Sequence, residues 1–431
     1  MIDKIKGILD DLKFSAYKIV ENKINSEEMF FIKKDLDMIR SKEIHNFKVT
    51  VYKDFVVEGL EYKGSSTFDI HPTMKEDEIK QLAIDNYFAA GFVKNQYYKI
   101  PNEVCENVNF KESTFSKKSL TEWMTLLVDA LYKEDKFDNG GINSSEVFLN
   151  KTYKRIINSE GIDISYESYN GMIEFITYWT AEEEIELYKV ITFSEYNPEY
   201  IEQVVKEMLF LSQKRAEAKE TPNTGRYKVI FRNDSVRELL NYYTFNTSVE
   251  GVYNKVSSLI LQDNVQGDEV EGDLISFDLD PYMSNSVKSM PYDNDGIILK
   301  KVRILDKGVF NKYHGDARHS FYLNVDATGI IENVIFEGGS KTLDEMKSSP
   351  YLELLSFSDF QLDSLTGDFG GEIRLAILFD GKNTKALTGG SVSGNIKSVQ
   401  NNMYLSKDLQ FAEGFIGPNA IEMFEIEIAG K

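Results

Sequence analysis

The chain has 431 residues, of which 42% are hydrophobic and 13% aromatic, which is enough for two or three folded domains and excludes a disordered chain. Its 70 acidic and 49 basic residues give a formal net charge of −21, which repels a phosphate backbone and argues against nucleic-acid binding as the main function. The single cysteine, Cys105, excludes an internal disulfide bond and a thiolate-cluster metal site.

The first residues are expected to form an amphipathic helix. Ile2, Ile5 and Ile8 recur at the spacing of one helix face. Charged residues interrupt this stretch every few positions, so it lacks the apolar run of a secretory signal peptide. Nowhere does the sequence reach the roughly 18 uninterrupted apolar residues that a membrane span needs. We therefore expect a cytoplasmic protein that does not enter a membrane.

Strands are predicted after this helix, followed by a return to helical spacing. Phe47, Val49 and Val51 alternate with polar residues, and we interpret residues 28–70 as an antiparallel meander. Apolar residues between positions 79 and 90 then recur at helical intervals, which predicts a second helix.

The next helix has a well-marked start and is followed by more strands. Ser119 and Glu122 form a capping box ahead of an apolar stripe, so we predict a helix from this point. Residues 145–195 have strand patterns again, with turns predicted at residues 158–161 and 170–171.

A long helix and a polar segment mark the predicted boundary between two lobes. Residues 200–220 carry apolar side chains at helical spacing, and residues 216–225 are polar and rich in turn-forming residues. We therefore place an N-terminal α+β lobe at residues 1–220 and a C-terminal, mainly β lobe at residues 226–431.

The second lobe is predicted to be antiparallel sheet around a central helix. Residues 227–232 are predicted to form a strand, and Asp234 is a candidate N-cap for the helix that follows. From about residue 272 the pattern is almost wholly strand and turn. The predicted fold class is α+β in two lobes: N-terminal helices packed on an antiparallel or mixed sheet, then a sandwich-like or barrel-like β lobe around a helix.

Metal and nucleotide motifs are weak. None of the four histidines has a zinc-protease spacing, although His314 and His319 lie close together with Asp316 between them. On a strand, positions five apart point to opposite faces, so these two imidazoles could share an ion only in a loop, and we favour a chance pair. Residues 135–146 match a calcium loop in part, but Phe137 offers no oxygen ligand, so we favour a polar loop. No glycine-rich nucleotide motif is present.

Several short segments of the second lobe follow one another in an order known from one protein family. They are residues 229–240, 291–296, 302–313, 366–370, 388–396 and 426–430. Their collinear order resembles the TldD/PmbA family, which is also described as modulators of DNA gyrase, and is most similar to its PmbA (TldE) branch. The first lobe is similar more loosely, through residues 158–161.

The resemblance implies a bacterial or archaeal peptidase system of two related subunits. The TldD-type subunit carries His-Glu-x-x-x-His on the helix after the first strand of this lobe and a later cysteine, which hold zinc, and the glutamate acts as general base. The PmbA-type subunit lacks these groups and completes the cavity that encloses the substrate.

The resemblance places Asn241 and Asn246 of this chain at the two histidine positions and Tyr242 at the glutamate position. Amides are poor zinc ligands, and tyrosine does not replace a carboxylate base near neutral pH. Cys105 lies in the other lobe. The resemblance therefore implies vestigial metal positions, no catalytic residue and no cofactor in this chain, with zinc only in a TldD-like partner.

On this basis we expect a subunit that helps to bind peptide or unfolded protein, paired with a TldD-like subunit or with a second copy, and binding neither nucleic acid nor membrane. Peptide is expected to add as a strand to a sheet edge of the second lobe. The candidate rim residues are Thr366, Gly367, Asp368, Gly389, Gly390 and Asn395. Two alternatives stay open: a stand-alone metallopeptidase of the same family that uses His314 and His319, and a homodimeric scaffold that has lost proteolysis. Any effect on DNA gyrase would be indirect.

Overall fold

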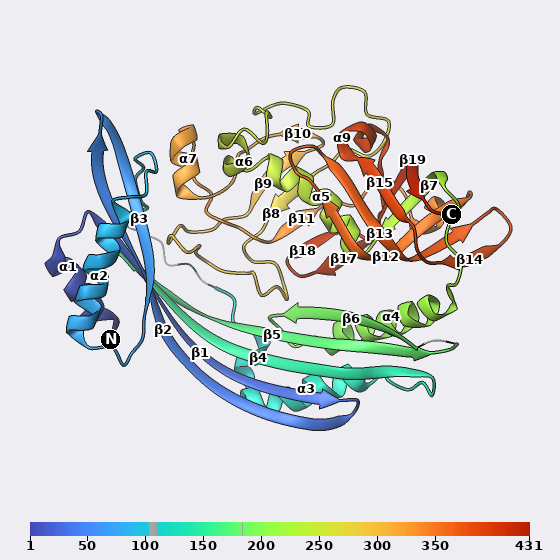
Figure 1. The fold of residues 1–431 in the computed structure, drawn as a ribbon, viewed down its shortest axis with the longest axis horizontal. Helices are drawn as coiled ribbons and strands as arrows, with labels where there is room; N and C mark the ends of the chain where they lie inside the picture. Colours follow the sequence, from blue (N-terminus) through green and yellow to red (C-terminus); the bar gives the residue numbers. More distant parts are fainter. Residues whose placement is uncertain (103–107, 109, 183) are drawn as a thin grey trace.

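The computed structural model describes residues 1–431 except 103–107, 109 and 183, so Cys105 lies outside the described residues. The molecule has two lobes of α+β type, a long curved sheet with helices and a β-rich lobe that lies over it (Figure 1). The predicted fold class is confirmed. The division between residues 220 and 226 stays a prediction. Among the described residues, no helix has the length and apolar character needed to cross a membrane.

The first lobe is built on one sheet of long antiparallel strands in the order β3-β2-β1-β4-β5-β6. The strands are β1 (Ala16–Ile32), β2 (Asp35–Val57), β3 (Leu60–Ile70), β4 (Gly140–Asn158), β5 (Asp163–Thr180) and β6 (Glu184–Phe193). At about 3.4 Å per residue, the 23 residues of β2 extend over roughly 75 Å. The meander begins at Ala16, earlier than predicted, because the polar stretch of residues 21–28 is also strand.

Four helices pack against this sheet in two pairs. They are α1 (Ile2–Leu12), α2 (Glu76–Ala90), α3 (Leu120–Tyr132) and α4 (Pro198–Glu217), and a short 3₁₀ turn covers Thr114–Lys117. The first pair shares a core with β1–β3, and the second pair shares a core with β4–β6. The predicted capping box is confirmed, since the Ser119 hydroxyl accepts the Glu122 N–H at 3.3 Å and the Ser119 N–H donates to the Glu122 carboxylate at 3.1 Å.

One predicted turn of the first lobe is confirmed and the other is wrong. Between β4 and β5, the Asn158 side chain accepts the N–H groups of Glu160 and Ile162 and closes the predicted turn. Gly171, by contrast, lies inside β5, opposite Phe193 of β6. A Cβ atom at Gly171 would lie 2.1 Å from the Phe193 ring, so the glycine makes room for a cross-strand aromatic ring. The partial calcium motif runs from the loop after α3 into β4, as the polar-loop interpretation requires.

The second lobe contains a closed barrel of five strands, β12-β7-β19-β15-β13, in which β13 also pairs with β12. The strands are β7 (Gly225–Arg232), β12 (Tyr351–Leu362), β13 (Asp368–Phe379), β15 (Ser391–Asn395) and β19 (Ala420–Ala429), with β14 (Thr384–Leu387) added outside on β13 and β16 (Tyr404–Leu405) on β19. The pair β7–β12 is parallel, because α5 and a long excursion separate these strands in the chain.

A second sheet lies beside the barrel, and helix α5 (Asp234–Asn246) shares one core with both. This sheet has the order β10-β9-β8-β11-β18-β17. Its strands are β8 (Phe277–Leu279), β9 (Val302–Asp306), β10 (Val309–Phe310), β11 (Val334–Phe336), β17 (Leu409–Ala412) and β18 (Phe415–Pro418). The central helix is therefore present as predicted, but its N-cap is Asn233, with φ of 57°, and Asp234 lies in the first turn.

Short helices were missed in the second lobe. They are α6 (Val249–Tyr253), α7 (Ala317–Leu323), α8 (Leu343–Met346) and α9 (Ile396–Val399), followed by a 3₁₀ turn at Gln400–Asn402. The pattern beyond residue 272 is thus less purely strand and turn than expected. Asp316, Thr342 and Asn395 each accept a backbone N–H of the helix that follows and so begin it locally.

Candidate functional site

The three positions at which the resemblance places vestigial metal ligands do not converge on one point. Asn246 is buried at the end of α5, and its amide donates to the carbonyls of Tyr242 and Ser364, both at 2.9 Å. Asn241 is exposed and makes a 3.4 Å hydrogen bond to Glu238 one turn earlier. Five residues along a helix correspond to a rotation of about 140°, so the two amides point to different sides.

Tyr242 lies between these positions as a neutral, packed phenol. Burial raises its pKa above the ordinary value for tyrosine. Its ring makes an edge contact with Tyr243, whose hydroxyl donates to the Gln400 side chain at 3.0 Å. Neither ring offers a base near neutral pH. The chemistry of this helix therefore does not suit a zinc ion.

The two neighbouring histidines are held by separate partners. The His314 Nε2–H donates to the Thr244 carbonyl of α5 at 2.9 Å, and burial lowers the pKa of His314 to about 4. The His319 Nδ1 atom lies 2.7 Å from the Asp316 carboxylate, which also accepts the His319 backbone N–H at 2.8 Å. The remaining ring nitrogen of His319 faces the Arg318 guanidinium at 3.4 Å, where a cation already stands.

The described residues also contain no group of three histidine, cysteine, aspartate or glutamate side chains arranged to hold a metal ion. The stand-alone metallopeptidase alternative requires such a group around His314 and His319. Because one imidazole donates to a carbonyl and the other faces a guanidinium, this pair lacks the free, convergent nitrogens that a metal centre needs.

Four of the six candidate groove residues lie together, and two lie elsewhere. The Asn395 amide donates to the Thr366 carbonyl at 3.1 Å and to the Asp368 carboxylate at 2.7 Å, and its hydrogen bond lowers the pKa of Asp368. Gly367, with φ of 83°, completes this turn. Gly389 and Gly390 precede the other end of β15, five residues or roughly 16 Å away, and both have positive φ.

The expected open sheet edge does not occur at this place, and that part of the hypothesis needs correction. Gly370 and Gly371 of β13 pair with β12 on one side and with β15 on the other, because the barrel closes here. Their main-chain groups are therefore occupied and cannot accept a peptide strand. The strands of this lobe that pair on one side only are instead β14, β16, β10 and β17. A role of the six residues in peptide binding stays a prediction.

A polar junction between the lobes is the feature that the sequence did not reveal. Asp293 is 2% exposed, and its carboxylate accepts the backbone N–H groups of Asp295, Ile297 and Ile330 at 2.9–3.2 Å. Burial raises the pKa of Asp293 to about 6. The carboxylate thus fixes the shape of the turn at residues 293–296.

Two lysines of the long sheet reach this turn. Lys18 of β1 pairs with Asp295 at 2.5 Å, and Lys154 of β4 donates to the Asn294 side chain at 2.6 Å. Burial and the nearby Lys18 lower the pKa of Lys154. These contacts join residues more than 100 positions apart. In the sequence, the only signal of this junction is the turn segment at residues 291–296, which is part of the family resemblance.

A pocket of about 250 Å³ lies beside this junction and is lined by both lobes. Its walls are Tyr52, Tyr98, Ile100, Pro101, Asp295, Asp316, Arg318 and Ile330. Another hollow, of about 290 Å³, lies on the sheet over the ends of β1, β4 and β5, around Phe30, Glu146 and Glu174. Only the first hollow combines residues of the two lobes.

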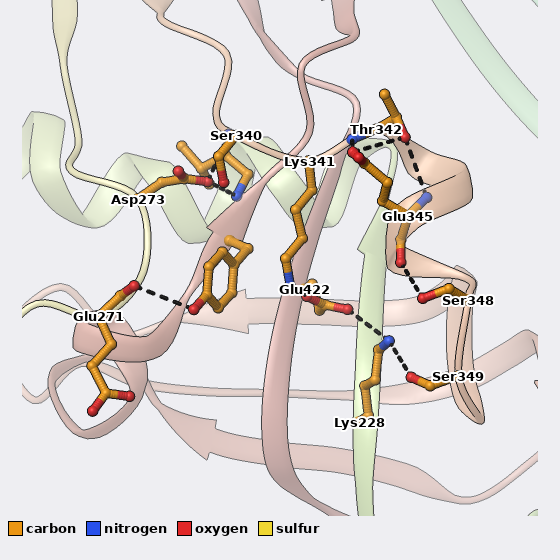
Figure 2. A network of polar contacts seen from close by, with 12 residues as sticks. Lys228, Glu271, Asp273, Ser340, Lys341, Thr342, Glu345, Ser348, Ser349 and Glu422 are labelled. Carbon is orange, nitrogen blue, oxygen red and sulfur yellow. Dashed lines mark hydrogen bonds and ion pairs between the residues drawn. The ribbon is translucent and has the colours of Figure 1, made fainter.

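A separate cluster of buried charge lies on the outer face of the barrel (Figure 2). Glu422 of β19 is 0% exposed and pairs with Lys228 of β7 at 2.8 Å and with Lys341. The Lys341 ammonium also lies 3.6 Å from the centre of the Tyr404 ring. The carboxylate is enclosed by its two cations, so this cluster has the character of a structural ion network.

The second lobe matches a known family. Residues 224–430 match the family model described as the PmbA/TldA metallopeptidase C-terminal domain. An uncharacterized protein of Methanocaldococcus jannaschii is 24% identical over 438 aligned residues, which cover 95% of this chain and 98% of that protein.

Solved structures share the fold of the whole chain. TldE from Thermococcus kodakarensis has a TM-score of 0.80 at 14% identity, with 100% of both chains covered. A candidate modulator of DNA gyrase from Thermotoga maritima has a TM-score of 0.76 at 17% identity, covering 99% of this chain and all of that one. A second candidate modulator, from Bacteroides thetaiotaomicron, has a TM-score of 0.78 at 16% identity and covers 100% and 99%.

Proposed function

We propose that this chain, which belongs to the TldD/PmbA family, works as the non-catalytic, TldE-like subunit of a two-subunit cytoplasmic peptidase. In this role it pairs with a zinc-bearing TldD-like subunit and supplies part of the wall around a peptide substrate. The observation that carries the proposal is the state of α5, where both N–H donors of the Asn246 amide go to main-chain carbonyls and Asn241 points to another side.

The inner face of the long sheet supports the second part of the proposal. Lys18 and Lys154 reach residues of the second lobe from this face, so side chains that alternate with them face the same way. Asn22 lies opposite Lys154, and Ser26 lies opposite Asn150. The half-buried Asn22 and Asn150 amides can donate to and accept from a peptide backbone without selecting its sequence, whereas the Ser26 hydroxyl is buried and donates to Glu28 at 3.2 Å.

An exposed apolar surface at one end of the first lobe supports pairing with another subunit. Phe88 of α2 is 67% exposed, and Phe92, just after this helix, is 71% exposed. The two rings contact each other with their centres 5.2 Å apart. Val56 and Leu60, at the turn between β2 and β3, are 65% and 62% exposed. Large exposed apolar side chains gathered in this way are typical of protein interfaces.

The proposal predicts that peptide cleavage requires both subunits. The purified chain alone is expected to leave an unfolded protein such as casein intact, and a mixture with a TldD-like subunit from the same organism is expected to degrade it. Zinc measured by mass spectrometry in each purified chain should be stoichiometric only in the partner. The partner alone serves as the control for its own residual activity.

Chelator-sensitive cleavage by the single chain that is lost in His319→Ala would contradict this proposal and favour the stand-alone peptidase. A symmetric dimer that neither binds a TldD-like subunit nor supports cleavage would favour the scaffold instead.

Replacing both Phe88 and Phe92 by glutamate is expected to weaken binding of the TldD-like subunit at least ~10-fold. Both rings are exposed, so the variant should keep the wild-type melting temperature, while two carboxylates in an apolar contact are costly to desolvate. Sedimentation velocity across a concentration series measures the dissociation constant. Phe210→Glu, a 50% exposed ring on α4, is the matched control. Equal affinities of the two variants would exclude this surface from the interface.

A further inference from the structure

The pocket between the lobes has the size and the lining of a binding site for one end of a peptide. Tyr52 of β2 and Tyr98 come from the first lobe, and Arg318 of α7 comes from the second. Its volume of about 250 Å³ is below the roughly 300 Å³ at which sites for drug-sized ligands begin. A terminal residue of a peptide fits such a space better than a drug-sized ligand does.

Both carboxylates of the pocket wall have partners of their own. Asp295 is paired with Lys18, whose side chain is only 15% exposed. Asp316 accepts two hydrogen bonds from His319, which lower the pKa of this carboxyl although burial opposes them. Each carboxylate therefore has a direct hydrogen-bond or ion-pair partner other than Arg318.

Arg318 makes no direct contact with a carboxylate, although its charge helps to lower the pKa of the nearby Asp316. Its one hydrogen bond, 3.4 Å long, goes to the His319 ring, and it forms no ion pair within the part of the chain that the structure describes. The guanidinium has five N–H donors, of which most remain free.

Two tyrosine hydroxyls add further donors. Tyr52 and Tyr98 are 7% and 8% exposed, and burial together with the nearby Asp295 raises the pKa of both phenols. They therefore stay protonated at neutral pH. Neither hydroxyl forms a hydrogen bond with another described residue, so both are available to an acceptor in the pocket.

We propose that this pocket binds the free C-terminal carboxylate of a peptide. The planar guanidinium of Arg318 matches a carboxylate with two parallel hydrogen bonds, and the two phenols donate to its remaining lone pairs. Ile100 and Ile330 offer apolar surface to the last side chain. Asp295 and Asp316 repel any anion in this space, and they repel a dianion such as phosphate more strongly than a singly charged carboxylate. The inference rests on the proposed function only in taking peptide as the substrate class.

The test compares a peptide acid with its amide on the single chain, so it is independent of the partner and of cleavage. The probe is N-terminally fluorescein-labelled Gly-Ala-Ala-Leu, as free acid or C-terminal amide, followed by fluorescence anisotropy. We expect the acid to bind ~10- to 100-fold more tightly than the amide, the range for charged hydrogen bonds. Arg318→Gln should abolish this preference, and Arg318→Lys should retain part of it.

The control and a milder variant keep the inference falsifiable. Arg374→Gln alters an exposed arginine on β13 and should leave the preference unchanged. Tyr98→Phe keeps the ring and should lower affinity for the acid a few-fold without changing that for the amide. Equal binding of acid and amide, an unchanged preference in Arg318→Gln, or displacement by inorganic phosphate as effective as by acetate would each overturn the inference. If the chain shows no preference for the peptide acid but cleavage still depends on the partner, the inference is wrong and the proposed function is unaffected.

Discussion

Replacing Glu422 by alanine is expected to lower the free energy of unfolding by about 3–5 kcal/mol. The carboxylate is fully buried between Lys228 and Lys341, and the Lys228 side chain is only 14% exposed (Figure 2). Removing it leaves two ammonium groups facing each other across a cavity, without the charge that offset their desolvation. Urea unfolding followed by far-UV circular dichroism measures the difference.

The same strand offers a matched control for this prediction. Glu427 also belongs to β19 and also pairs with β7, through Arg226 at 2.8 Å, but both side chains are about three-fifths exposed. Glu427→Ala should therefore cost less than about 1 kcal/mol. A cost for Glu422→Ala no larger than that of the control would show that the buried cluster does not hold the barrel together.

A second buried glutamate is coupled to the first. Glu353 of β12 is 3% exposed and pairs with Arg232 at 2.6 Å and Lys347 at 2.7 Å. Glu353 and Glu422 both lie opposite Ile230, on its two sides, so they share one rung of the barrel. We therefore expect that the losses of unfolding free energy caused by the two single substitutions do not add in the double variant.

His314→Gln is expected to flatten the acid side of the stability curve by about 3 kcal/mol between pH 6.5 and pH 4. Burial lowers the pKa of His314 to about 4, so the folded state binds fewer protons than the unfolded state in this range. The stability that the neutral imidazole contributes is complete above pH 6.5 and is lost as the pH falls through 4. Glutamine keeps an N–H donor for the Thr244 carbonyl but does not titrate.

Asp293 changes the free energy of unfolding with pH in the opposite direction to His314. The experiment must therefore measure the difference between the wild type and the variant. Burial raises its pKa to about 6, so its contribution is complete below its unfolded value of 3.8 and is lost as the pH rises through 6. Subtracting the curve of His314→Gln from that of the wild type removes this contribution. His71→Gln, at an exposed histidine, is the control and should give a flat difference. A flat difference for His314→Gln as well would contradict the burial argument.

The parts of the fold that were predictable depend on neighbours in sequence. The capping box of Ser119 and Glu122 and the alternation of Phe47, Val49 and Val51 are local patterns, and both were correct. Gly171 was wrongly predicted to form a turn. A glycine is needed there because the Phe193 ring on the next strand leaves no room for a side chain. The helix that Asp316 begins was missed because a single aspartate ahead of a short helix has no periodic stripe behind it.

The candidate site was less predictable because it depends on long-range contacts. Lys18 and Asp295 are 277 residues apart, and nothing in either neighbourhood indicates the other. The family resemblance placed α5 correctly, but it did not identify Arg318 or the two tyrosines of the pocket. These three residues come together in one pocket wall only once both lobes are folded.

The order of the barrel strands along the chain determines how long β7 stays exposed during synthesis. Its two neighbours, β12 and β19, begin at residues 351 and 420, whereas β7 ends at residue 232. Both rows of β7 backbone donors and acceptors therefore emerge from the ribosome long before either neighbour exists to cover them. Such nascent edges are sites where chains associate wrongly, so biosynthesis of this protein should depend strongly on general chaperones.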